Sequence, residues 1–110
     1  MPGLRDNFKG NMMISTLLIF QYDKDFDEQK ITAIAEQARS KFEGFPELRS
    51  KAFTVSTERK QAINFYVWES AEAARQFFNP DNIKMISGLY GATPDISFLD
   101  VKVLVDNHKQ

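Results

Sequence analysis

Between residues 63 and 78 the side-chain pattern changes from that of a strand to that of a helix. Successive side chains of a strand point to opposite faces, and residues 63–68 divide in this way into an apolar face and an aromatic, partly polar one. The two sets are Ile63, Phe65 and Val67, and Asn64, Tyr66 and Trp68. Ser70 then offers an N-cap oxygen, and Glu72 a favourable negative charge, to a helix predicted over residues 71–78.

Three further stretches carry a strand pattern. Both faces of residues 13–22 are substantially apolar, so we expect cover on both sides of this strand. Residues 48–57 and 62–69 are joined by a short polar connection and predict a hairpin. Residues 96–106 alternate again and predict the last strand.

Helix signals occur at two more places. Asp25 and Glu28 resemble a capping box, and the amphipathic helix that follows is ended by Gly44 and Pro46. The second helix is broken by the Asn-Pro pair at 79–80, after which only one short turn is predicted before the last strand.

This order of elements predicts an α+β fold. The βαββαβ arrangement is ferredoxin-like, with a four-stranded antiparallel sheet and two helices on one face. We expect one domain over residues 13–106, a flexible leader at 1–12 and a polar tail at 107–110 that holds His108.

Two helices leave one face of such a sheet uncovered. On the alternation of the strands, we expect that face to carry a large apolar set, which a soluble monomer does not leave wet. A second copy would cover it in a two-fold symmetric homodimer, giving a dimeric α+β barrel. The set is Phe53, Val55, Tyr66, Trp68, Phe98 and Leu104.

Composition removes several classes of function. The chain has 14 basic and 15 acidic residues and a net charge of -1, so neither a nucleic-acid nor a membrane partner is expected. It contains no cysteine, which excludes disulfides and thiolate chemistry and fits a cytoplasmic setting. No cluster with metal-ligand spacing, phosphate loop or nucleophile elbow occurs, so we expect no metal.

The candidate site is the aromatic and polar face of the hairpin. Lys51, Phe53 and Val55 share the parity of Asn64, Tyr66 and Trp68, and Phe98 belongs to the same predicted surface. Other interpretations stay open: Trp68 can be a core or interface ring, Asn64 can satisfy local backbone groups, and Tyr66 can pack at a dimer interface. Lys51 can equally join Asp100 and Lys102 in an ion-paired rim.

Residues 64–73, Asn-Phe-Tyr-Val-Trp-Glu-Ser-Ala-Glu-Ala, resemble the antibiotic-biosynthesis monooxygenase group of the dimeric α+β barrel superfamily. Gly44-Phe-Pro46 and the strand from Lys51 are also similar to monooxygenases of the YdhR type. The likeness in element order covers about residues 13–106, and the likeness in residues is concentrated between 44 and 74.

The resemblance implies an activity and its residues. In cofactor-free members of the group, an Asn and a Trp four residues apart line a pocket where a phenolic or quinol-type substrate reacts with oxygen. The matching positions are Asn64 and Trp68. By strand alternation, Tyr66 is expected to face the same cavity, where it could act as proton donor or substrate clamp. Neutral donors that stabilise an electron-rich anion suffice for this chemistry, so no cofactor is expected. A haem role is disfavoured, because residues 71–78 lack the histidine that haem-degrading relatives carry.

Two functions from different classes follow. The first is a cofactor-independent monooxygenase acting on a small aromatic compound. The second is a non-catalytic module whose aromatic interior holds an apolar ligand or only builds a dimer. An enzyme needs a hollow pocket with converging polar groups, whereas a structural barrel needs none.

Overall fold

A computed structural model describes residues 10–107 of the chain, and the predictions for residues 1–9 and His108 lie outside this range. The described part contains four strands and three helices. In chain order they are β1 (Ile14–Gln21), α1 (Glu28–Phe42), β2 (Leu48–Ser56), β3 (Gln61–Trp68), α2 (Ala71–Phe77), α3 (Pro80–Tyr90) and β4 (Asp95–Asp100).

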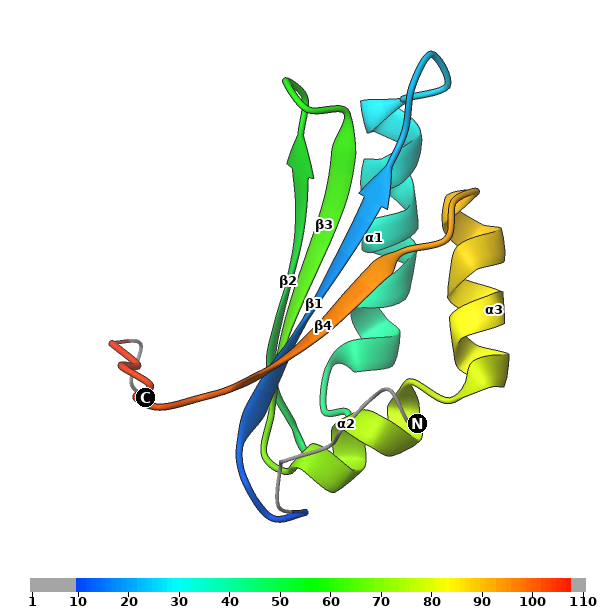
Figure 1. The fold of residues 1–110 in the computed structure, drawn as a ribbon. Coiled ribbons are helices and arrows are strands. Elements are labelled where there is room, and N and C mark those ends of the chain that lie inside the picture. Colours follow the sequence, from blue (N-terminus) through cyan, green and yellow to red (C-terminus); the bar gives the residue numbers. More distant parts are fainter. Residues whose placement is uncertain (1–9, 108–110) are drawn as a thin grey trace.

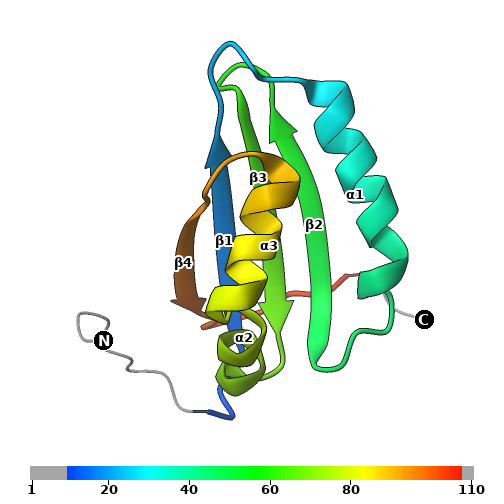
Figure 2. The same cartoon turned by 90° about the vertical axis from the view of Figure 1, so that its right-hand side faces the viewer.

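The strands form one antiparallel sheet in the order β2-β3-β1-β4. All three helices lie on the same side of it, and the chain after β4 leads away on the opposite side (Figure 1). Seen from the helical side, α3 crosses in front of the central strands and α1 runs beside β2 (Figure 2). This is the ferredoxin-like α+β fold that the sequence predicted.

The helix caps differ in part from the predicted ones. Ser70 caps α2 as expected, since its side chain accepts a hydrogen bond from the amide of Ala73. The N-cap of α1 is Asp27, not Asp25, and the Asp25 carboxylate instead accepts a bond from the backbone of Asp23. The predicted position of the N-cap is therefore wrong by two residues, although the helix itself is confirmed.

The region after the second helix is more regular than predicted. Where the sequence predicted one short turn, the structure has the 11-residue helix α3. Asn79 caps this helix, and Gly91 ends it in the left-handed conformation at φ 72°. Gly88 lies inside this helix without interrupting it. The predicted end of the last strand at residue 106 is also wrong. β4 ends at Asp100, where its pairing with β1 ends. Val103 and Val105 beyond it are 80% and 74% exposed.

The hairpin confirms the predicted parity of its strands. Lys51 lies opposite Tyr66 and Phe53 opposite Asn64, so these side chains share one face of the sheet. A bulge between Leu48 and Ser50 shifts the register at the start of β2, where the chain arrives from α1.

The prediction of which face is left uncovered is wrong. Tyr66 and Trp68 are each only 1% exposed, because they lie beneath the helices with Phe77 and Phe78 of α2 packed on their rings. Each aromatic pair adds about 0.5–1.5 kcal/mol to the burial of its rings, so these contacts favour the packing of α2 on this face. Phe53, Val55 and Phe98 lie on the same helix-covered side, and Leu104 lies beyond the sheet.

The face that has no helix on it carries a different apolar set. Phe65 is 38% and Leu99 45% exposed there. Leu17 lies opposite Phe65, and the next pair on this face is Ile19 with Ile63; these three residues are half-buried. Among the described residues, no helix is long and apolar enough to cross a membrane.

Candidate functional site

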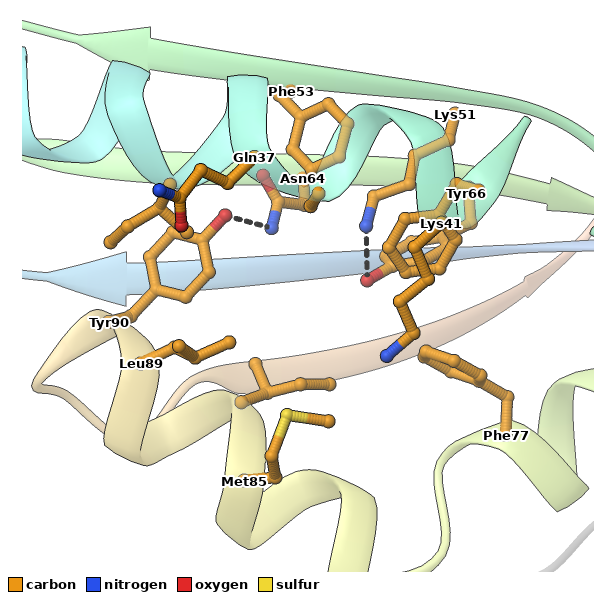
Figure 3. Close-up of a pocket in the computed structure, with 14 residues that line it drawn as sticks. Gln37, Lys41, Lys51, Phe53, Asn64, Tyr66, Phe77, Met85, Leu89 and Tyr90 are labelled. Carbon is orange, nitrogen blue, oxygen red and sulfur yellow. Dashed lines mark hydrogen bonds between the residues drawn. The ribbon is translucent and has the colours of Figure 1, made fainter.

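A cavity of about 240 Å³ lies between α1, α3 and the β2–β3 hairpin. Its walls are mostly apolar, with Phe42, Phe77, Met85, Ile86 and Leu89 among them. Gln37 and Lys41 of α1 add polar groups to the lining, and four more polar side chains form hydrogen bonds at the cavity: Lys51, Asn64, Tyr66 and Tyr90. Figure 3 shows them as two hydrogen-bonded pairs facing the same space. A cavity of about 150 Å³ can hold benzene, so this one has room for a somewhat larger aromatic compound.

The first pair joins β3 to α3. The Asn64 amide nitrogen donates a hydrogen bond of 3.1 Å to the Tyr90 hydroxyl, and both residues are buried, at 2% and 7% exposure. Tyr90 is held by two further contacts, because its ring stacks on Phe20 at 4.1 Å and its carbonyl accepts a 2.6 Å bond from the Tyr22 hydroxyl. A hydroxyl donates as well as accepts, so the Tyr90 hydrogen is available to a molecule in the cavity.

The second pair joins β2 to β3. The Lys51 amine donates a 3.0 Å hydrogen bond to the Tyr66 hydroxyl. Its nitrogen lies 3.5 Å from the centre of the Phe42 ring and 4.2 Å from the ring centres of both Phe53 and Tyr66. The Lys51 amine therefore sits in a cage of three aromatic rings, and within residues 10–107 no carboxylate forms a salt bridge with it.

Burial in this cage disfavours the protonated form of the Lys51 amine. Burial, together with the nearby positive charge of Lys41, lowers its pKa to about 7. Cation–π attraction opposes this by roughly 1–2 kcal/mol. Removing an ammonium from water costs several kcal/mol, which is the larger effect. Near neutral pH the site therefore holds a lysine that exchanges readily between its charged and uncharged forms.

The two tyrosines at the cavity stay protonated near neutral pH. Burial raises the pKa of Tyr66, and it also raises the pKa of Tyr90, although the hydrogen bond from Asn64 partly offsets the effect there. Both hydroxyls and the Asn64 amide are therefore uncharged groups that can donate hydrogen bonds. An arrangement of this kind can bind an oxygen atom that carries a developing negative charge.

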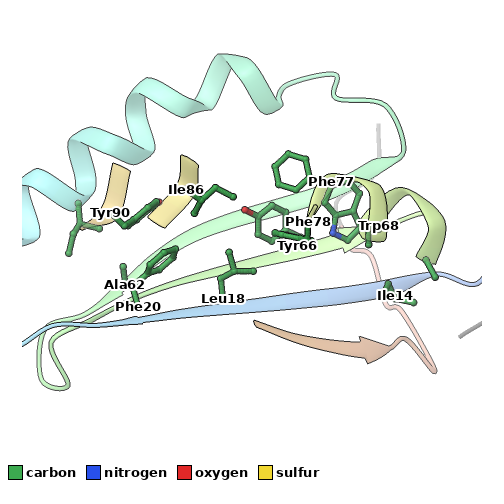
Figure 4. Packing of buried hydrophobic residues seen from close by; sticks show 13 residues of the cluster. Ile14, Leu18, Phe20, Ala62, Tyr66, Trp68, Phe77, Phe78, Ile86 and Tyr90 are labelled. Carbon is green, nitrogen blue, oxygen red and sulfur yellow. The ribbon is translucent and has the colours of Figure 1, made fainter. Parts of the chain in front are cut away.

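Trp68 lies away from this cavity. Its indole nitrogen donates a 3.1 Å bond to the hydroxyl of Thr16, and both side chains are fully buried. Its ring stacks on the ring of Tyr66 on the side of Phe77 and Phe78, as Figure 4 shows. The structure thus brings Asn64 and Tyr66 to one site and leaves Trp68 behind Tyr66 as packing.

The predicted substrate-binding residues are divided in the same way. Lys51 and Phe53 line the cavity. Val55 does not line it, but lies with both of them at a neighbouring hollow of about 380 Å³ on the other flank of α1. Phe98 of β4 packs edge-on against Phe78. The suggested rim of Lys51 with Asp100 and Lys102 does not form, since Lys102 pairs with Asp100 at 3.0 Å and Lys51 joins no salt bridge within the described part of the chain.

Sequence reasoning missed the contribution of α3. Tyr90, Met85 and Leu89 all come from the helix that was predicted as a short turn. The spacing of Ile83, Ile86 and Tyr90 carried the signal for a helical face. Across residues 10–107, no group of three His, Cys, Asp or Glu side chains could hold a metal ion.

Neither a protein-family model nor a curated protein matches this sequence. Solved structures do match its fold. The cofactor-independent oxygenase SnoaB of Streptomyces nogalater superposes with a TM-score of 0.64 at 11% identity, covering 86% of this chain and 97% of its own. A monooxygenase of Streptomyces coelicolor in complex with nanaomycin D gives a TM-score of 0.62 at 17% identity, over 89% and 95% of the two chains.

A third similar structure has another activity. The hydroxynitrile lyase of Passiflora edulis gives a TM-score of 0.59 at 9% identity, over 87% of this chain and 99% of its own. The comparisons therefore show that this chain shares its fold with two oxygenases and a lyase. One fold serves several chemistries, so the chemistry has to be argued from the site.

Proposed function

We propose that this protein is a monooxygenase that needs no cofactor and oxidises a small phenolic or quinol-type aromatic compound. The observation that carries the proposal is the apolar cavity on which two tyrosine hydroxyls and the Asn64 amide converge. The names of two structurally similar proteins, an oxygenase described as cofactor-independent and a monooxygenase, point to the same reaction class.

The chemistry requires little of the protein. A phenol or hydroquinone that loses its proton becomes an electron-rich anion, which can itself reduce dioxygen. The protein has to bind the ring, exclude water and stabilise the negative oxygen. The aromatic walls suit the first two tasks, and Asn64, Tyr66 and Tyr90 suit the third.

We also propose a homodimer. The open face of the sheet exposes Phe65 and Leu99, and a second copy of the chain could bury both. This face differs from the one the sequence suggested, so the cavity lies on the helical side and the proposed interface on the other. A cytoplasmic location stays a prediction from composition.

Oxygen uptake tests the reaction. The purified protein is given a panel of hydroquinones, naphthols and anthrone-like phenols, with a metal chelator present and no added flavin. Uptake above the buffer blank that Tyr90→Phe or Asn64→Ala reduces roughly a hundredfold supports the proposal, since one such donor is commonly worth about 3 kcal/mol. Uptake that appears only with added flavin or metal contradicts it.

The same panel separates the enzyme from the second candidate, a ligand-binding module. A hollow with converging polar groups argues against a barrel that is only structural, because such a barrel would fill its interior with side chains. Binding of the phenols without any oxygen uptake would favour the non-catalytic module.

A further inference from the structure

We infer that the Lys51 amine is the proton acceptor of this site and that it ionises a phenol or hydroquinone bound in the cavity. The inference rests on the function proposed above, because it names the base for the same cavity. Neither the resemblance nor the structural comparisons assign a base.

The geometry of Lys51 suits this role. A lysine on a β-strand normally extends its amine into water, whereas Lys51 folds over Phe42 and Phe53 and lines the cavity. The Tyr66 hydroxyl fixes the nitrogen at 3.0 Å, so the amine occupies one position beside the space where a ligand ring would lie.

The surrounding charges favour the uncharged amine. From α1, Lys41 adds a positive charge on one side of Lys51, and the Glu36–Arg39 ion pair lies at the neighbouring hollow on the other flank. The other titratable groups facing it are the hydroxyls of Tyr66 on β3 and Tyr90 on α3, both neutral. α2 contributes only the Phe77 ring to the lining.

Proton transfer then gives a balanced step. The bond between the phenol oxygen and its hydrogen breaks, the proton adds to the lone pair of the Lys51 nitrogen, and the electron pair stays on the oxygen. The products are a phenolate and an ammonium in contact. The ammonium keeps the hydrogen bond that the Lys51 nitrogen already donates to the Tyr66 oxygen, and the Tyr90 hydroxyl can donate to the phenolate.

A purely structural lysine would behave differently. An ammonium held only by cation–π contacts would keep its charge and attract any anion, and its replacement by arginine would preserve that attraction. A proton acceptor has to begin uncharged, which arginine cannot do. Arginine therefore separates the two roles.

The test follows the ionisation of a bound ligand rather than turnover. 2-Naphthol is added to the protein at about pH 8, where an ordinary phenol is neutral. Lys51, with its pKa of about 7, is then mostly uncharged. The absorbance of the bound ligand distinguishes naphthol from naphtholate. Calorimetry in buffers of different ionisation enthalpy gives the number of protons released on binding.

Three variants accompany the wild type. Lys51→Met removes the amine and keeps an apolar chain of similar length. Lys51→Arg keeps a permanent charge. Lys84→Met is the matched control, because Lys84 lies exposed on α3 and does not line the cavity. Circular dichroism and thermal melting verify that each variant is folded.

We expect the wild type and Lys84→Met to bind naphtholate without releasing a proton to the buffer, because the proton moves to Lys51. The attraction between the ammonium and the naphtholate in the buried cavity offsets the difference of about 3 between the pKa of an ordinary phenol and that of Lys51. Lys51→Met should bind neutral naphthol, and Lys51→Arg should bind naphtholate with release of about one proton. Naphthol that stays neutral in the folded wild type overturns the inference and leaves the proposed monooxygenase standing. Equal ionisation in the wild type and Lys51→Met also overturns it. Failure of every phenol in the panel to bind overturns both proposals.

Discussion

The Asn64 amide donates to the Tyr90 hydroxyl at 3.1 Å and so ties the middle of β3 to the last residue of α3. This bond lies at one end of the cavity, and both of its partners are buried. It therefore holds a helix against the sheet and also orients two of the donors proposed for the site.

Removing one partner of this bond should cost stability. Tyr90→Phe leaves the Asn64 amide buried without that acceptor, which typically costs about 1–3 kcal/mol. Urea denaturation measures the loss. In the double variant Asn64→Leu, Tyr90→Phe no polar group is left unpaired, so we expect part of the stability to return. A double variant whose loss equals the sum of the single losses would show that the two side chains do not interact.

Stability should depend on pH through Lys51. Its pKa is about 7 in the folded protein and near 10.5 in the unfolded chain, so the unfolded chain binds more protons between these values. The free energy of unfolding should therefore rise with pH over about pH 7 to 9, by up to a few kcal/mol. The range stops there because Tyr22, Tyr66 and Tyr90, whose pKa values are raised, act in the opposite direction at higher pH.

Lys51→Met provides the control for this pH dependence. The variant has no amine to deprotonate, so the rise over that range should largely disappear, and the variant should be more stable than the wild type below about pH 7. Chemical denaturation at several pH values gives both curves. An equal slope for the two proteins would mean that Lys51 is not the group responsible.

Trp68→Phe should affect folding more than turnover. The change deletes the indole N–H that donates a hydrogen bond to Thr16. The buried Thr16 hydroxyl then lacks this donor, which should lower the free energy of unfolding by about 1–3 kcal/mol. The cavity residues stay in place, so oxygen uptake by the folded variant should remain close to that of the wild type. A large loss of uptake with little change in melting temperature would restore the donor role that the sequence suggested for Trp68.

Assembly should depend on the open face of the sheet. We expect a dimer at micromolar concentration, and light scattering that gives one chain of 12.7 kDa over that range would contradict it. Phe65→Asp places a charge in the proposed interface and should yield monomers. Val55→Glu is the matched comparison, because Val55 lies on the helical side of the same sheet. Its effect should be on thermal stability and not on association.

The succession of strands along the chain could be predicted because the sequence signals for each element are local. Alternation along β3, the Ser70 cap and the short connection of the hairpin each act within a few residues. The length of β4 could not be predicted in this way. Alternation continues past Asp100, but the pairing with β1 ends there, and the partner strand is far away in the sequence.

The choice of the covered face was also beyond local signals. Both faces of β3 are apolar enough to be buried. The helices cover the face of Tyr66 and Trp68 because Phe77 and Phe78 pack on those two rings. α3 is longer than the predicted short turn, because Gly88 inside it costs only about 1 kcal/mol and does not end the helix. The predicted site lacked Tyr90 for the same reason, since Tyr90 is the last residue of α3 and lines the cavity.

The bulge at the start of β2 protects the molecule from unwanted polymerisation. β2 is one of the two edge strands of the sheet, and its free backbone groups could template a strand from another molecule. The irregular register between Leu48 and Ser50 interrupts that template. Arg49, which lies in the bulge, adds charge there through ion pairs with Glu69 at 3.5 Å and Asp106 at 3.3 Å. Edge-to-edge growth along β2 is therefore disfavoured, and concentrated solutions of the folded chain should resist fibril formation from this side.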